Sequence, residues 1–434
     1  MKTRPIPLAA TAVAAAVSLF AAARAEAIPA FARKYGTSCS TCHVAFPKLN
    51  DFGEAFRRNA FQIPQDDEFY VKDAPVALGA QAWKEEFPNA IWPGDIPHLP
   101  PISFLTRLST SFDSEEDVKG DFNFPEYFNF LFGGTFGPDI GFFAHTGPGT
   151  RLYLRMANVL DDDLGPRALN ATIGLVEPAY APLSNVRRLT ITPYLYSDYT
   201  VELPNGNGND FQLDRQRAIE IDGVIASRAS WAIGVTNGTN DSSDNNSRKD
   251  VYYRVAGKLG GIAFDGTGGA VEGDSLVQTE NWTDNSLTLG HSGYFGSNTP
   301  SDVTSGDDYS IDFYRLIFDV RGNTGDLDVT AGVVLGSDDN AGNDDVKVGS
   351  EIYFVEVQYV FFPWLIAIAR GEWLDYDLPG GDDSLDESEV RRLVLSATAL
   401  IRANLKFIVE GRFDDGGEGR QGGEALLLAL DFSF

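Results

Sequence analysis

Residues 424–434, with the sequence EALLLALDFSF, form the stretch that decides the fold. Leu426, Leu428, Leu430, Phe432 and Phe434 occupy alternate positions, so in a strand they line one apolar face that ends on an aromatic ring. The last strand of bacterial outer-membrane barrels has this pattern. The stretch therefore predicts a mainly β chain that forms a transmembrane antiparallel β-barrel.

The same alternation continues upstream to about residue 101, in segments separated by loops rich in Asp, Asn and Gly. One face of these segments is apolar, and the other carries the charged residues Arg254, Lys258, Asp328, Lys406, Glu410 and Arg412. Tight turns alternate with connections of about ten or more residues, as in barrels with short periplasmic turns and longer outer loops. A soluble sandwich is the alternative, but its strands are usually shorter and its polar face lies outside.

The number of strands must be even if both ends of the barrel lie in the periplasm. The candidate runs are 101–112, 126–136, 139–146, 151–159, 168–177, 188–199, 216–226, 229–237, 249–259, 286–296, 308–320, 326–336, 351–361, 364–374, 389–401, 404–413 and 424–434. Counting from both ends leaves 188–199 as the surplus run, and Pro193 disfavours a central strand there. We therefore predict about 16 strands. Residues 178–215 then form one long external loop, which either stays outside the barrel or folds into its lumen. The Gly-rich stretch 260–285 is too long for a routine periplasmic turn.

Composition narrows the class of protein further. The 434 residues include 62 acidic and 34 basic side chains, giving a formal charge of −28 and a pI near 4.4. This charge argues against a protein that binds nucleic acid by neutralising phosphates. Beyond the N-terminus there is no apolar run of roughly 18 residues, which argues against a helical membrane protein.

The N-terminus has the layout of a secretory signal. Lys2 and Arg4 precede an apolar stretch from Leu8 to Ala23, and small residues follow it. We predict cleavage after Ala27, which removes a signal peptide of residues 1–27. The rest of the chain then divides into an N-terminal segment (28–76), a Pro-rich connector (77–100) and the barrel (101–434).

Both cysteines of the chain fall in one pentapeptide, Cys39-Ser40-Thr41-Cys42-His43. This is the spacing of a c-type haem attachment site, in which two thiols add to the vinyl groups of one porphyrin and the histidine ligates the iron. A redox dithiol, half a zinc site and chance are the alternatives, but the flanking sequence lacks a βαβ pattern and a second Cys or His pair. We expect one covalent haem c on Cys39 and Cys42, with His43 as the proximal ligand.

Residues 28–76 are then expected to form a monohaem cytochrome c segment, and this haem segment is too small to bury a haem alone. Leu49, Phe52 and Phe56 are at helical spacing and predict a short amphipathic helix within 48–62. Small domains bury a low fraction of their own surface, whereas a barrel of about 16 strands leaves a wide bore. We therefore expect 28–76 to lodge in the bore or at its periplasmic mouth, where the wall shields the porphyrin.

The distal ligand is constrained by the scarcity of suitable residues. His98, in the Pro-rich connector, is the nearest candidate along the chain and our prediction, with five-coordinate iron as the alternative. Met156 and His291 follow alternating leucines and are expected on the lipid side of the barrel. His145, at a strand end, remains open.

Four stretches near the N-terminus resemble one family. They are 28–36 (IPAFARKYG), 39–43 (CSTCH), 46–50 (FPKLN) and 52–57 (FGEAFR). They are similar to the fused monohaem cytochrome–porin family of outer-membrane electron-transfer proteins, which includes the iron(II) oxidases of iron-oxidising bacteria. The resemblance is most specific over 28–62 and rests on layout beyond it. It implies that the haem, held by Cys39, Cys42 and His43, passes electrons across the outer membrane between an extracellular donor or acceptor and periplasmic carriers.

Two functions remain open, and both place the barrel in outer-membrane lipid. In the first, extracellular Fe²⁺ reduces the haem and a periplasmic c-type cytochrome removes the electron, so iron(II) oxidation is the one enzymatic activity considered. In the second, the chain is a solute or anion-selective porin whose haem segment is a plug or sensor. Acidic clusters in predicted outer loops would attract cations, although solubility and cation bridging to surface lipid explain them equally well. These clusters are Asp113 to Asp121, Asp241 to Asp250, Asp338 to Asp345 and Asp375 to Glu389.

Overall fold

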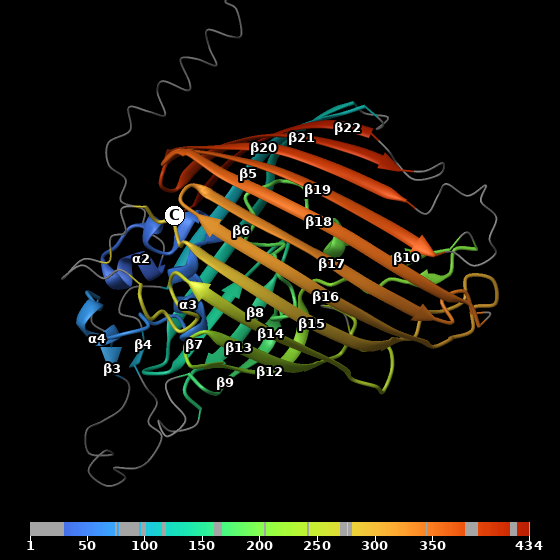
Figure 1. Cartoon of the computed structure of the whole chain (residues 1–434), viewed down its shortest axis with the longest axis horizontal. Coiled ribbons are helices and arrows are strands. Elements are labelled where there is room, and N and C mark those ends of the chain that lie inside the picture. Colours follow the sequence, from blue (N-terminus) through green and yellow to red (C-terminus); the bar gives the residue numbers. More distant parts are fainter. Residues whose placement is uncertain are drawn as a thin grey trace, which may run out of the picture.

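The computed structural model describes residues 30–73, 76–77, 95–96, 101–114, 119–159, 167–203, 205–240, 243–269, 276, 280–343, 345–377, 389–416 and 423–433. Within them, 16 antiparallel strands form one closed barrel, with short helices at one end and inside (Figure 1). Strand β22 (Gly423–Ser433) closes the barrel by pairing with β5 (Ile102–Asp113). The predicted fold class is confirmed. None of the described helices has the length and apolar character needed to cross a membrane.

The remaining barrel strands follow in chain order. They are β6 (Gly120–Thr135), β7 (Ile140–His145), β8 (Arg151–Met156), β9 (Asn170–Val176), β12 (Gln216–Ile225), β13 (Ala229–Thr236), β14 (Asp250–Gly260), β15 (Ser286–Asn298), β16 (Ile311–Thr324), β17 (Leu327–Asp339), β18 (Lys347–Phe362), β19 (Leu365–Asp377), β20 (Val390–Arg402) and β21 (Leu405–Gly416). The helices are α2 (Ala30–Tyr35), η1 (Cys39–Thr41), α3 (Asp51–Arg58), α4 (Asp67–Tyr70) and α6 (Leu195–Asp198). Three two-residue or three-residue strand pairs lie outside the barrel: β1 (His43–Ala45) with β2 (Lys48–Leu49), β3 (Val76–Ala77) with β4 (Asp95–Ile96), and β10 (Val201–Glu202) with β11 (Gly208–Asn209).

The strands alternate as the sequence predicts. In β21 the side chains of Phe407 and Val409 are exposed on the outside, whereas Lys406, Ile408 and Glu410 are buried on the lumen side. An apolar outer band with a polar interior is the pattern of a transmembrane barrel. The predicted lumen positions of Lys258 and Asp328 are confirmed in the same way, because both side chains are buried.

The surplus run 188–199 is not a barrel strand, as predicted, and the segment between β9 and β12 folds into the lumen. Two carboxylates of the barrel wall hold it there. The Glu410 side chain accepts from the backbone N–H of Ile191 at 2.7 Å, and that of Glu372 accepts from Leu195 at 2.6 Å. Tyr196, in the middle of the segment, is fully buried. This lumen segment, residues 177–215, fills part of the bore.

The expected alternation of tight and long connections is only partly right. As the alternation predicts, one end of the barrel has tight turns, at 136–139, 226–228, 325–326, 363–364 and 403–404, but the connection 146–150 at the opposite end is shorter than expected. At the tight-turn end, the connection 261–285 is long because it packs against the N-terminal segment. There Phe264 lies 4.7 Å below the guanidinium of Arg58, and Asn281 donates to the His43 carbonyl.

The N-terminal segment, residues 30–63, lies at the end of the barrel that carries the C-terminus and the tight turns (Figure 1). It is anchored to several parts of the wall. Ala30 N–H donates to Ser103 Oγ at 2.9 Å, and the Gln62 amide donates to the Gly137 carbonyl at 2.9 Å. On the opposite side of the bore, Lys48 Nζ donates to the Gln358 amide oxygen at 2.7 Å.

Candidate haem site

The haem motif forms a tight turn at the start of the N-terminal segment. Residues Cys39–Thr41 make a single 3₁₀ turn, closed by a hydrogen bond from Cys42 N–H to the Cys39 carbonyl at 3.2 Å. His43 follows directly as the first residue of the short strand β1. Both cysteines are free and half-buried. The turn therefore holds the two thiols and the imidazole close together, as one porphyrin requires.

Helix α3 fixes this turn from behind. Its N-cap residue, Asn50, accepts from Gly53 N–H at 2.8 Å and donates to the Thr41 carbonyl at 3.1 Å. Asn50 N–H also donates to the Cys42 carbonyl at 3.0 Å. Gly53 is required for this approach, because a Cβ at that position would lie 2.9 Å from the Cys42 carbonyl carbon. The predicted helix is confirmed, over Asp51–Arg58 within the expected 48–62.

The ring of His43 is oriented by a backbone carbonyl. Its Nδ1 lies 3.2 Å from the Pro47 carbonyl oxygen, and the ring packs beside Phe46. Burial lowers the pKa of His43 to about 4, so the imidazole is neutral at physiological pH. A neutral histidine that donates from Nδ1 to a carbonyl presents Nε2 to a metal, which is the usual arrangement of metal-bound histidines.

The turn opens onto a cavity between the N-terminal segment and the barrel wall. The cavity contains about 1250 Å³ of atom-free space, including the part that is open to solvent. Its walls are mainly apolar and include an aromatic cluster: Phe31 stacks on Phe61 with 5.2 Å between ring centroids, and Phe61 in turn contacts Phe143 and Tyr153 of the wall at 5.8 and 6.1 Å. Apolar, aromatic walls suit a large flat cofactor.

The residues present fit a covalent haem. Cys39 and Cys42 would form the thioethers and His43 would supply a nitrogen ligand, all from the rim of one aromatic cavity. The bound haem would supply one-electron redox chemistry. Burial raises the pKa of the Cys42 thiol to about 12, and it also raises the pKa of Cys39, so neither is a reactive thiolate at neutral pH. This is unfavourable for the competing dithiol reading.

The structure answers part of the question of the distal ligand. His98 lies outside the described residues, so it remains a prediction. Met156 lies on the outer face with its exposed neighbours Leu152 and Leu154, and His291 stacks on the exposed Phe318 at 4.3 Å, as expected for lipid-side positions. The open case, His145, points into the lumen.

Both ring nitrogens of His145 already have protein partners. Nδ1 lies 3.0 Å from the Gly149 carbonyl oxygen, and Nε2 lies 2.9 Å from the side-chain nitrogen of Asn129. These contacts have to break before His145 can ligate iron. Apart from His43, no histidine or methionine among the described residues lines the cavity.

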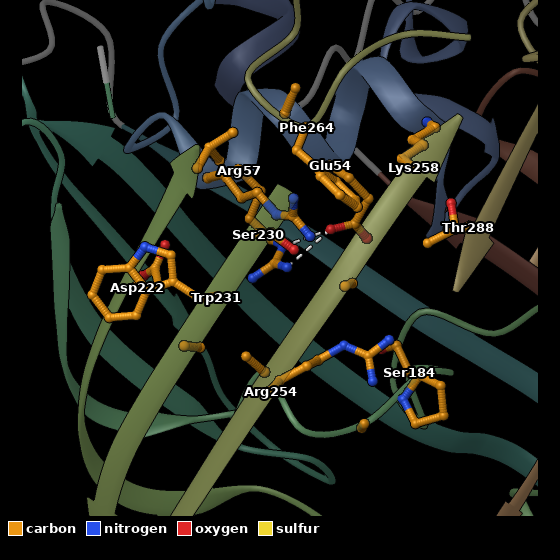
Figure 2. Close-up of a pocket in the computed structure, with 18 of the residues that line it drawn as sticks. Glu54, Arg57, Ser184, Asp222, Ser230, Trp231, Arg254, Lys258, Phe264 and Thr288 are labelled. Atoms are coloured by element: carbon orange, nitrogen blue, oxygen red, sulfur yellow. Dashed lines mark hydrogen bonds and ion pairs between the residues drawn. The ribbon is translucent and has the colours of Figure 1, made fainter. Parts of the chain in front are cut away.

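A second, polar chamber adjoins the haem cavity (Figure 2). It lies between α3, the lumen segment and the wall, contains about 1360 Å³ of atom-free space, and shares Arg57 and Arg187 with the haem cavity. Figure 2 shows Glu54 and Arg57 of α3 paired, with 2.9 Å between carboxylate oxygen and guanidinium nitrogen. Basic and acidic groups alternate on its surface: for example, Arg254 pairs with Asp319 at 2.9 Å.

Among the residues that the structure describes, no three His, Cys, Asp or Glu side chains cluster closely enough to hold a metal ion. The described parts of the acidic outer loops therefore contain no built iron site. Sequence reasoning missed Asn50, whose position before a helix is an N-cap signal. It also missed the wall residues Phe143 and Tyr153, for which no local signal exists.

Comparisons with known proteins agree on the barrel alone. The chain matches no family model, and no curated protein matches it. Among solved structures, an anion-selective porin from Comamonas acidovorans is similar at a TM-score of 0.51 and 9% identity, covering 77% of this chain and 98% of the porin. The barrel has the porin fold. OmpT of Vibrio cholerae (TM-score 0.49, 10% identity, 77% and 97% covered) and OmpF of Salmonella typhi (0.48, 11%, 77% and 97%) are also similar. At such low identities the likeness shows the fold alone, and this fold supports an outer-membrane location.

Proposed function

We propose that this protein transfers electrons in the outer membrane through one covalent c-type haem, accepting them from extracellular Fe²⁺ and passing them to a periplasmic cytochrome. The observation that carries the proposal is the position of Cys39, Cys42 and His43 on the rim of an aromatic cavity. A haem held by Cys39, Cys42 and His43 would supply one-electron chemistry, so each turnover would oxidise one Fe²⁺ to Fe³⁺ and deliver one electron to the periplasmic carrier.

The orientation expected for the barrel supports the periplasmic partner of the proposal. In barrels of this kind the short turns and the chain termini face the periplasm, and the long loops face outward. The N-terminal segment lies at the end with the tight turns, where Gln62 contacts Gly137, and Ser433 of the C-terminal strand lines the same cavity as the haem motif. A haem in this position is close to periplasmic carriers, as the proposal requires.

The filled lumen favours an electron conduit over an open solute pore. The N-terminal segment occupies one end, and the lumen segment crosses the bore beyond it. Within the lumen segment Tyr180, Tyr196 and Leu213 are almost completely buried, and they belong to the same apolar cluster as Phe56 and Phe61 of the N-terminal segment. Electrons can pass through packed protein, whereas hydrated solutes need a continuous aqueous path.

Fe²⁺ as the donor rests on the resemblance of the N-terminal segment and on charge. The net charge of −28 creates a field that concentrates cations near the surface. Because the described acidic loops lack a clustered metal site, we propose attraction and brief contact rather than a stable iron complex.

Reduction of the purified protein by Fe²⁺ tests the proposal. The full chain is produced with a working cytochrome c maturation system, and its visible spectrum is followed after rapid mixing with Fe²⁺. We expect a covalently bound haem that is reduced in the wild type and is absent from Cys39→Ser/Cys42→Ser. The matched control, Ser38→Ala/Ser40→Ala, changes two hydroxyls in the same turn and keeps both thiols. A colourless wild type, or a haem that Fe²⁺ leaves oxidised, contradicts the proposal.

An anion-selective porin is the second candidate, and the polar chamber offers it a charged lining inside the barrel. Seven basic residues line the chamber, Arg57, Arg58, Arg155, Arg187, Arg254, Lys258 and Arg321, beside six acidic ones, Asp51, Glu54, Glu177, Glu220, Asp222 and Asp319. One similar structure is described as an anion-selective porin, although the likeness extends to the fold alone. Single-channel recordings in planar bilayers separate the candidates. Sustained anion conductance with a redox-inert haem supports the porin, and a closed channel with a haem that Fe²⁺ reduces supports the conduit.

A further inference from the structure

The charged lining of the haem cavity is unbalanced. Among the described residues that line it, the ionised side chains are Arg57, Arg151 and Arg187, and none is a carboxylate. A mainly apolar cavity is a poor environment for cations, because burying a charge costs free energy unless an opposite charge or hydrogen-bond acceptors compensate it. The cavity lining therefore selects for a negatively charged group.

Two of the three guanidinium groups are already neutralised from outside the cavity. Arg57 pairs with Glu54 at 2.9 Å, and Arg187 pairs with Glu177 at 2.7 Å. Both carboxylates lie on the side of the polar chamber. These two arginines contribute little uncompensated charge to the haem cavity.

Arg151, on β8, is different. Its residue is 8% exposed, and its Nε atom is buried without a hydrogen-bond partner. Within the described part of the chain, its guanidinium makes no hydrogen bond or ion pair. It lies over the face of the Phe143 ring, 5.2 Å from the centroid, and the Glu177 carboxylate, already paired with Arg187, acts on it only from beyond ion-pair distance. A cation–π contact recovers only part of the solvation that a buried guanidinium loses. Arg151 thus presents unused donors to the cavity.

The chemistry of the proposed cofactor supplies the missing anion. A haem carries two vinyl groups on adjacent pyrroles and two propionates on the other pair, so thioether attachment at Cys39 and Cys42 directs the carboxylates away from the attachment turn. A guanidinium binds a carboxylate through paired N–H donors and is the usual partner for such a group. Resting on the proposed function, we propose that Arg151 binds a haem propionate and thereby orients the porphyrin against the barrel wall.

The test measures how the reduction potential of the bound haem depends on pH in the full-length protein. An adjacent guanidinium favours the ionised propionate and lowers its pKa by about one to three units. In Arg151→Gln we therefore expect the propionate-linked bend in the potential-against-pH curve to move up by about one to three pH units. Arg151→Lys keeps the positive charge, so its curve should be shifted much less from that of the wild type. Arg254→Gln is the matched control, because it removes a lumen guanidinium that lines only the polar chamber.

Three outcomes have distinct meanings. An upward shift in Arg151→Gln that is small in Arg151→Lys and absent from Arg254→Gln supports the proposal. A coloured Arg151→Gln protein whose curve equals that of the wild type overturns the role of Arg151 and leaves the haem function standing. A colourless wild type overturns both. If the glutamine variant does not fold, Arg151→Met removes the same charge and is read in the same way.

Discussion

Replacing Gly141 with alanine should loosen the N-terminal segment without touching the haem motif. Gly141 faces the lumen on β7, where a Cβ would lie 2.7 Å from the carbonyl carbon of Ala60 and 3.0 Å from a ring carbon of Phe61. Ordinary contacts begin near 3.4 Å, so the segment or the wall has to move by most of an ångström. Over-packing of this kind costs about 1–3 kcal/mol.

That cost sets the size of the effect. If this cost destabilises the state in which the N-terminal segment is bound to the barrel wall, the fraction of molecules with the segment released rises by a factor of about 5 to 150, because about 1.4 kcal/mol corresponds to a factor of ten. Trypsin reports this fraction, since Lys34 and Lys48 bracket the haem motif and are cleaved only when the segment leaves the wall. Where opening and closing are faster than cleavage, the cleavage rate follows the open population.

Release of the peptide 35–48 is measured by mass spectrometry in detergent. The matched control is Gly322→Ala, a strand glycine whose added Cβ would have nothing within 4 Å. We expect faster release in Gly141→Ala and an unchanged rate in Gly322→Ala. Equal rates in Gly141→Ala and the wild type would refute the idea that the wall and the segment fit together at this point.

Three further changes test how the N-terminal segment is held. Lys258→Met removes the cation that bridges Asp51 and Asp284, whose carboxylate oxygens lie 2.5 and 2.7 Å from Lys258 Nζ. Breaking a buried pair costs about 3–5 kcal/mol, so hydrogen–deuterium exchange in α3 should become faster by roughly a hundredfold or more, and an unchanged exchange rate would contradict this anchor. Asn50→Ala removes the α3 cap and should lower the stability of the helix by about 1 kcal/mol and reduce the yield of haem-bearing protein, whereas Asn50→Asp keeps the cap but cannot donate to the Thr41 carbonyl. Equal yields for the wild type and both variants would argue against the role of Asn50. Although burial opposes it, the arginines around Glu54 lower the pKa of its carboxyl group from 4.5 to about 2, so the ionised carboxylate stabilises the folded segment at pH values above about 4.5. Resistance to proteases should therefore decline as the pH falls from 4.5 towards 2 in the wild type, and it should decline less in Glu54→Gln.

The barrel was predictable because the bilayer imposes a strict pattern on each strand. Where a strand crosses lipid, every second residue must be apolar, and this signal located all 16 strands. It weakens where strands extend beyond the lipid, so the ends were less accurate. Strand β18 begins at Lys347 rather than at 351, because its outward residues there, such as Lys347 and Glu351, are polar or charged and break the apolar alternation.

The candidate site was predictable only in part. Its ligands are local in sequence, and the spacing of Cys39, Cys42 and His43 is informative without a structure. The cavity is not local, since Phe143 and Tyr153 occupy ordinary alternating positions in two strands, and nothing in those strands indicates that they face Phe61. Which lumen residues meet the N-terminal segment depends on strand register and tilt around the whole barrel. A single sequence does not determine these precisely.

The contacts of the N-terminal segment explain why the candidate haem site depends on the barrel. Aromatic packing joins the segment to β7 and β8, while Lys48 reaches Gln358 on β18 and Asp51 reaches Lys258 on β14. The cavity beside the segment spans the place where the barrel closes, because Ser103 and Phe104 of β5 and Ser433 of β22 all line it. The cavity is therefore complete only after the barrel has closed. A small segment that buries little surface of its own thus gains a rigid, largely apolar site from the bore, and in turn it occupies the space through which solutes would pass.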